Sequence, residues 1–255
     1  MSDKKFNIAI LIDGDNAQAK LLKQTIEEVS KYGKATIRRI YGDWTSNVMN
    51  SWKDLINQYS INPIQKFSYT TGKNSTDGAL IIDAMDILHS KSVEGFCIVS
   101  SDSDYTGLAK RIREEGLFVM GIGEKKTPEA FVKSCDIFTF TENISPKPKK
   151  VEKTTRKPER QEKNNTPKKI NKKGSLILTD NDYETISKAF EISINDNDVA
   201  YVSNVGANIR KIDPSFDTRS YGFYSLTKLF DNLDEFEIIK NEVGDLNHPL
   251  IKRVQ

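Results

Sequence analysis

The stretch FCIVSSDSDYTGLAKRI, residues 96–112, shows most directly how this chain folds. An apolar run ends in two acids, Asp102 and Asp104, and a segment with helical periodicity follows. Residues 8–18, IAILIDGDNAQ, repeat this arrangement with Asp13 and Asp15. Short continuous apolar runs are typical of strands that are buried on both faces of a parallel sheet. Both acidic pairs are therefore predicted to lie where a central strand leaves the core.

Strand and helix patterns alternate along residues 6–140, which predicts an α/β fold: an open parallel sheet with helices on both faces. The predicted strands are residues 6–13, 35–41, 63–69, 96–101, 117–121 and 137–140, and the predicted helices are residues 17–32, 46–59, 76–89, 105–115 and one that runs through Phe131. Such sheets bind ligands at the carboxyl ends of their strands. If the two apolar strands are neighbours, Asp13 and Asp102 meet at that edge.

The composition is typical of a folded protein and argues against a zinc site or a membrane segment. Of the 255 residues, 37% are apolar and 29% are charged, which is enough for a core with a polar surface. The two cysteines form no CxxC pair and the only two histidines, His89 and His248, lie far apart in sequence, so we expect no structural zinc site. No run of about 18 apolar residues occurs, so we expect no membrane segment and a soluble, reduced, cytoplasmic protein.

Residues 145–173 form a strongly basic segment. Ten Lys and two Arg against three Glu give this segment a net charge of +9, whereas the whole chain carries only +2. Four prolines and two aliphatic residues cannot support a core, so the segment is predicted to be a disordered linker. Two roles stay open: a solubilising spacer, or a nonspecific grip on a polyanion such as nucleic acid.

A third acid joins the predicted edge through helical geometry. Asp77 lies in the first turn of the helix predicted at residues 76–89, on its apolar face, whereas Asp83 and Asp86 fall on the other side. Gathered carboxylates repel one another unless their pKa values rise or a dication joins them. Because every candidate ligand atom is an oxygen, the favoured ion is Mg²⁺ or Mn²⁺, which supports hydrolysis of phosphodiesters. The alternative for each single acid is helix capping.

Three motifs carry a resemblance to a known family. IDGDNAQ (residues 12–18), KNSTDGALIID (73–83) and IVSSDSDYTGLAKRIREEGLFVMGIGE (98–124) closely resemble the NYN domains of the PIN-like nuclease superfamily. The likeness covers residues 6–140 and implies a metal-dependent ribonuclease. It implies Asp13, Asp77, Asp102 and Asp104 as the metal-binding and catalytic acids, Asn16 and Ser101 as residues that orient the site, Lys73 as a phosphate contact, and Asp15 and Asp83 as acids of second rank. Asp15 departs from the family, in which glutamate is common there.

Residues 174–255 read as a second, smaller domain. Helices are predicted at residues 182–192, 199–212 and 225–232, and a strand at 236–240, which suggests a winged helix of the α+β class. FDTRSYGFYSLTKLFDNLDEFEI strongly resembles the LOTUS domain, also called OST-HTH, which implies binding of RNA and, in some members, of a protein partner. Arg219, Tyr221 and Lys228 are the RNA-contact candidates, with ordinary packing as the alternative; Tyr221 and Tyr224 could stack on bases.

Together these features predict a metal-dependent endoribonuclease. Residues 1–144 are the expected nuclease domain, 145–173 the basic linker and 174–255 the RNA-holding domain. Two rival functions remain: an RNA-binding adaptor that cleaves nothing, and a haloacid-dehalogenase-type phosphatase with Asp13 as nucleophile. The sequence leaves open the natural RNA, the number of metal ions and the oligomeric state.

Overall fold

A computed structural model describes residues 6–67, 75–146, 177–243 and 246–254. Two predicted features, Lys73 and the linker beyond Pro146, lie outside these residues. The chain divides into two compact units, one built mainly from residues 1–144 and the other mainly from the residues that follow.

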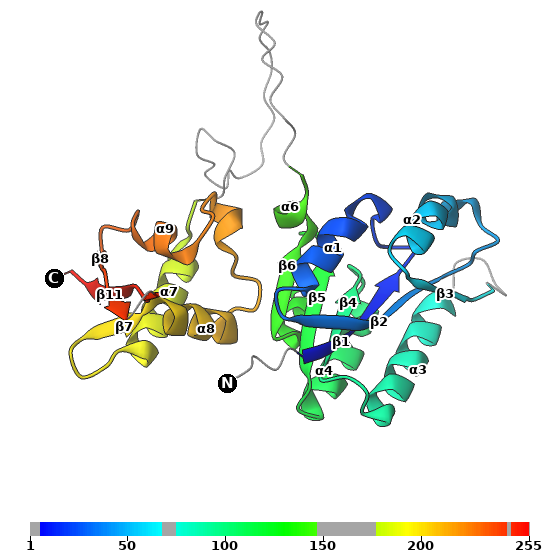
Figure 1. The fold of residues 1–255 in the computed structure, drawn as a ribbon, viewed down its shortest axis with the longest axis horizontal. Helices are drawn as coiled ribbons and strands as arrows, with labels where there is room; N and C mark the ends of the chain where they lie inside the picture. Colours follow the sequence, from blue (N-terminus) through cyan, green and yellow to red (C-terminus); the bar gives the residue numbers. More distant parts are fainter. Residues whose placement is uncertain (1–5, 68–74, 147–176, 244–245, 255) are drawn as a thin grey trace, which may run out of the picture. The chain divides into compact units, whose positions relative to one another are not determined.

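The first unit is a six-stranded parallel sheet with helices on both faces (Figure 1). The strand order is β3-β2-β1-β4-β5-β6. The strands are β1 (Phe6–Asp13), β2 (Gly33–Gly42), β3 (Asn62–Gln65), β4 (Gly95–Val99), β5 (Phe118–Gly123) and β6 (Ile137–Phe140). The two apolar runs of the sequence are the central strands β1 and β4, so the predicted open parallel α/β fold is confirmed.

Two apolar clusters hold the helices on the sheet, one on each face. The helices are α1 (Leu22–Val29), α2 (Lys53–Gln58), α3 (Ser75–Ser90), α4 (Thr106–Glu114), α5 (Glu129–Ser134) and α6 (Thr141–Ile144), with 3-10 turns at Ala19–Leu21 (η1), Asn47–Trp52 (η2) and Ser103–Tyr105 (η3). Side chains of α3, α4 and α5 pack in one cluster, and those of α1, α2 and η2 pack in the other. Helices on both faces are what buries the central strands completely.

Several element boundaries differ from the prediction. The helix predicted at residues 17–32 ends at Val29, and β2 already begins at Gly33. Gly33 lies so close to β1 that a Cβ atom there would stand 2.3 Å from the backbone oxygen of Phe6. The glycine therefore serves close strand pairing and not only helix termination. The strand predicted at residues 63–69 ends at Gln65.

The second unit combines three helices with a small antiparallel sheet. Its helices are α7 (Asp180–Ser193), α8 (Val202–Ile212) and α9 (Leu226–Phe230), with a 3-10 turn η4 (Thr218–Tyr221). Its strands are β7 (Val199–Tyr201), β8 (Phe236–Ile239), β9 (Glu242–Val243), β10 (Leu246–Asn247) and β11 (Leu250–Arg253). The three helices and the antiparallel sheet of order β7-β11-β8 confirm that the second unit is a helix-and-sheet domain.

One prediction for this unit is wrong. The sequence pattern predicts a helix over residues 199–212, but residues 199–201 form β7 and pair antiparallel with β11. Valine and tyrosine favour strands, and here a partner strand about fifty residues later decides the conformation.

Candidate active site

The pairing of β1 with β4 builds the site. Ile12 lies opposite Val99 in the parallel register, so the chain leaves the two central strands side by side at Asp13 and Ser100. Neighbouring strands lie about 5 Å apart. Two loops that carry polar side chains thus start from one point of the carboxyl edge.

Asp13 is fully buried and has several hydrogen-bond donors around it. Its Oδ2 accepts a hydrogen bond from Ser100 Oγ at 2.8 Å and another from Asn16 Nδ2 at 2.7 Å. Its Oδ1 accepts from the backbone nitrogens of Asp15 at 3.2 Å and Asn16 at 3.4 Å. A buried carboxylate is tolerated when such donors compensate its lost hydration. Asp13 therefore holds the loop after β1 against the end of β4.

Asp102 and Asp104 follow β4 in the turn η3. Asp102 is the N-cap of this turn: its carboxylate accepts from the backbone nitrogen of Asp104 at 3.0 Å, and its own nitrogen donates to Ser100 Oγ at 3.1 Å. Asp102 is half-buried and Asp104 is exposed. Asp102 is thus a helix cap, as the alternative interpretation predicted, but the capping hydrogen bond occupies only one of its two carboxylate oxygens.

Asp77 reaches the same place from the first turn of α3. The residue is only 9% exposed, and its Oδ1 accepts a hydrogen bond from the hydroxyl of Tyr105 at 2.6 Å. Burial raises the pKa of the Asp77 carboxyl above its usual value, while the hydrogen bond from Tyr105 lowers it. The negative charges of Asp13, Asp102 and Asp104 raise the pKa of Asp77 further, so these acids interact through space.

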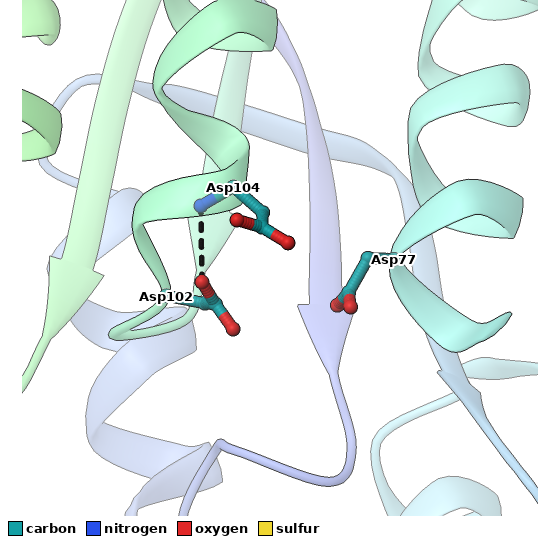
Figure 2. Close-up of side chains that lie close together, drawn as sticks. All are labelled: Asp77, Asp102 and Asp104. Carbon is teal, nitrogen blue, oxygen red and sulfur yellow. Dashed lines mark hydrogen bonds between the residues drawn. The ribbon is translucent and has the colours of Figure 1, made fainter. Parts of the chain in front are cut away.

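Three carboxylates come together at this edge. One oxygen each of Asp77, Asp102 and Asp104 lies within 4.8 Å of the other two. Figure 2 shows Asp77 approaching from α3 and facing the turn that carries the other two acids. Asp13 is not a member of this close group. Three convergent carboxylate oxygens fit a hard dication, which prefers oxygen ligands and keeps some of its own waters.

The second-rank acids lie apart from this group. Asp83 forms an ion pair with Arg39 and accepts a hydrogen bond from the hydroxyl of Tyr41, so its charge is already matched within the fold. Asp15 is exposed, and its backbone nitrogen donates to Asp13. Ser101, implied as a residue that orients the site, accepts a hydrogen bond at its Oγ from the backbone nitrogen of Glu124 at 2.8 Å.

Sequence reasoning missed two residues of the site, Ser100 and Tyr105. Ser100 could have been found from the strand pairing, because the residue after β4 lies beside the residue that ends β1. Tyr105 carries no such signal, since an aromatic residue at a helix start is usually a core residue. Burial raises the pKa of Tyr105, so its hydroxyl keeps its proton and acts as a donor to Asp77.

The RNA-contact candidates of the second unit have partners within that unit. The Arg219 guanidinium binds both carboxylate oxygens of Asp217, at distances from 2.6 to 3.0 Å. The Tyr221 hydroxyl donates to Asp182 at 2.8 Å, and Lys228 Nζ lies 3.0 Å from an oxygen of Asp231. In contrast, the Tyr224 side chain is 80% exposed.

Comparison with known proteins identifies both units. A family model, NYN domain, matches residues 7–143, more than half of the chain. The chain belongs to the NYN domain family. A second model, OST-HTH/LOTUS domain, matches residues 178–248 of this NYN-family chain. Both resemblances that the motifs suggested are confirmed, in the predicted order along the chain.

Comparison with individual proteins finds similarity to two solved structures. No curated protein matches the chain. A protein of unknown function from Vibrio parahaemolyticus is 19% identical with a TM-score of 0.46, and the match covers 54% of this chain and 94% of that one. An uncharacterized protein from Nitrosomonas europaea is 19% identical with a TM-score of 0.27, covering 41% and 93% of the two chains.

Among the described residues, no helix combines the length and the apolar character that crossing a bilayer requires.

Proposed function

We propose that this NYN-family protein is a metal-dependent endoribonuclease that hydrolyses RNA phosphodiesters at the group of Asp77, Asp102 and Asp104. The observation that carries the proposal is the convergence of these three carboxylates within 4.8 Å at the carboxyl edge of an NYN domain. A LOTUS domain on the same chain supports RNA as the substrate class.

The three close carboxylates are the proposed ligands. Their oxygens suit Mg²⁺ or Mn²⁺ better than softer metals. When bound, such an ion supplies electrophilic stabilisation of the phosphodiester and activation of water. Mutual repulsion also supports a bound cation, since the charges of Asp102 and Asp104 raise the pKa of Asp77.

Asp13 and Asn16 have a supporting role in this proposal. Asp13 is fully buried, and Ser100 and Asn16 both donate to its Oδ2. The carboxylate therefore fixes the two loops that carry the site, and its negative charge acts on Asp77 through space. This burial also disfavours the phosphatase alternative, because a nucleophilic carboxylate must reach the phosphorus of its substrate.

His89 is not the base of the proposed reaction. His89 lies on α3, twelve residues after Asp77, and one of its ring nitrogens is 2.7 Å from the backbone oxygen of Met85. A helix rises about 1.5 Å per residue, which places His89 about 18 Å from Asp77 along the axis. Hydrolysis without a covalent intermediate on the protein is the proposed course.

In the proposed function, one part of the chain cleaves RNA and the other parts bind it. Residues 1–144 would cleave, while the basic segment 145–173 and the LOTUS domain at 174–255 would hold RNA and raise its concentration near the site. The exposed Tyr224 is a better candidate for base stacking than Tyr221, whose hydroxyl is bound to Asp182. A protein partner at the LOTUS domain is compatible with this proposal.

The test is cleavage of labelled RNA and DNA with Mg²⁺, with Mn²⁺ or with EDTA. Loss of one metal-binding carboxylate removes several kcal/mol of transition-state stabilisation, so Asp102→Asn should lower the rate by about a thousandfold. Asp86→Asn is the matched control, because Asp86 is an exposed carboxylate of α3 that is not in the close group. Equal cleavage by wild type and Asp102→Asn would contradict the proposal, and RNA binding without cleavage would favour the adaptor.

A further inference from the structure

A buried hydrogen bond connects the acidic group to the core. The hydroxyl of Tyr105 donates to Asp77 Oδ1 at 2.6 Å, and Tyr105 is fully buried. Its ring packs in the apolar cluster near Phe131, with 6.3 Å between the ring centroids. Packing of this kind fixes the ring, so the donor stays at one position.

Tyr105 also belongs to the turn that supplies the other two acids. It is the last residue of η3, which Asp102 caps and which contains Asp104. Asp77 comes from α3, more than twenty residues earlier, and faces this turn (Figure 2). One short turn thus provides two carboxylates and the hydroxyl that positions the third.

The hydrogen bond limits how Asp77 can bind a cation. A carboxylate that donates both oxygens to one ion must turn both toward it, and Asp77 Oδ1 already accepts a hydrogen bond from the buried hydroxyl of Tyr105. Ca²⁺ takes six to eight oxygens and often binds carboxylates through both atoms, whereas Mg²⁺ requires six ligands in a tight octahedron. A carboxylate with one oxygen held back suits the smaller ion.

We propose that Tyr105 determines the metal preference of the site, because its hydrogen bond keeps Asp77 a one-oxygen ligand and so favours Mg²⁺ and Mn²⁺ over Ca²⁺. Tyr105 acts here as a positioning residue and does not touch the ion. The proposal rests on the proposed function, since it requires that Asp77, Asp102 and Asp104 bind a dication.

The test is calorimetric titration of the full-length protein with Mg²⁺, Mn²⁺ and Ca²⁺, which needs no catalysis. Loss of a residue that supports a metal ligand typically weakens metal binding by about 10- to 100-fold. Tyr105→Phe should weaken Mg²⁺ and Mn²⁺ binding to this extent and Ca²⁺ binding much less. The affinity ratio therefore shifts toward Ca²⁺ by about tenfold or more, which a merely structural role would not cause.

Tyr41→Phe is the matched control. Tyr41 is also fully buried, and its hydroxyl also donates to an aspartate of α3, Asp83, which is not in the close acidic group. This variant should leave the ratio of Ca²⁺ to Mg²⁺ affinity at the wild-type value.

Three results would overturn the inference. If the ratio of Ca²⁺ to Mg²⁺ affinity in Tyr105→Phe equals that of wild type, Tyr105 does not set the preference, even if all affinities fall together. A wild-type protein that binds Ca²⁺ as tightly as Mn²⁺ would refute it whether or not the variant folds. Absence of binding of all three ions to wild type would refute the metal site of the proposed function, and the preference with it.

Discussion

Removal of one hydroxyl should destabilise the first unit strongly. Ser100 is only 2% exposed; its Oγ donates to Asp13 Oδ2 at 2.8 Å and accepts from the backbone nitrogen of Asp102 at 3.1 Å. A hydrogen bond to a charged group contributes about 1.5–3 kcal/mol, and a neutral one about 1 kcal/mol. Ser100→Ala should therefore lower the free energy of unfolding by about 2.5–4 kcal/mol.

Tryptophan fluorescence can follow the unfolding of the first unit separately from the second. Its two tryptophans, Trp44 and Trp52, both lie in the first unit, so tryptophan fluorescence during urea unfolding reports on that unit without contribution from tryptophans of the second. Trp52 is close to the affected loop, because its Nε1 donates to the backbone oxygen of Gly14 at 3.2 Å. With slopes of about 1–3 kcal/mol per molar urea, the midpoint should fall by about 1 M or more.

A second buried serine serves as the control. Ser134 is 3% exposed, and its Oγ donates to the neutral backbone oxygen of Phe131 at 2.7 Å. Ser134→Ala should cost about 1 kcal/mol, since no charge loses a partner. If Ser100→Ala destabilises no more than Ser134→Ala, Ser100 does not stabilise the buried charge of Asp13, and the reasoning is refuted.

Two further predictions concern Asp77 and the basic segment. The pKa of Asp77 is raised in the folded protein, so its stabilising contribution is present below the ordinary carboxyl pKa of about 4 and is lost as pH rises through the raised value. In EDTA at neutral pH, Asp77→Asn should therefore have a higher melting temperature than wild type, as measured by tryptophan fluorescence. An equal or lower melting temperature would contradict this. Deletion of residues 146–172 should weaken RNA binding and flatten its dependence on salt, relative to a neutral segment of equal length, and an unchanged slope would leave only a spacer.

Much of the site follows from local patterns in the sequence. β1 and β6 have the bounds that their apolar runs predict, and the acids at the end of β1 and in the turn after β4 lie at the carboxyl edge. Helical periodicity placed Asp77 on the face of α3 that packs on the sheet, where it is buried. These features depend on residues that are near one another in sequence, so local sequence patterns are enough to predict them.

The remaining features depend on contacts between distant residues. β7 forms because Ala200 pairs with Ile251, and no property of residues 199–201 shows that partner. The ion pair between Asp83 and Arg39 connects α3 to β2, and Arg39 lies more than forty residues earlier in the chain. The contact between Tyr105 and Asp77 spans 28 residues and depends on side-chain packing. Sequence patterns therefore predict which side chains reach the edge more reliably than which side chains they touch there.

The acids at this edge fall into two kinds, and hydrogen bonding distinguishes them. Asp13 accepts hydrogen bonds at both oxygens from donors on two loops, so the fold itself compensates its burial. Asp77 is also buried, but its pKa is raised, which shows that the hydrogen bond from Tyr105 does not offset burial and repulsion. A carboxylate that the fold compensates serves structure, whereas one that the fold leaves uncompensated among like charges gains most from a bound cation. In the proposed metal site, a bound cation would therefore favour the ionised form of Asp77, the acid whose pKa is raised.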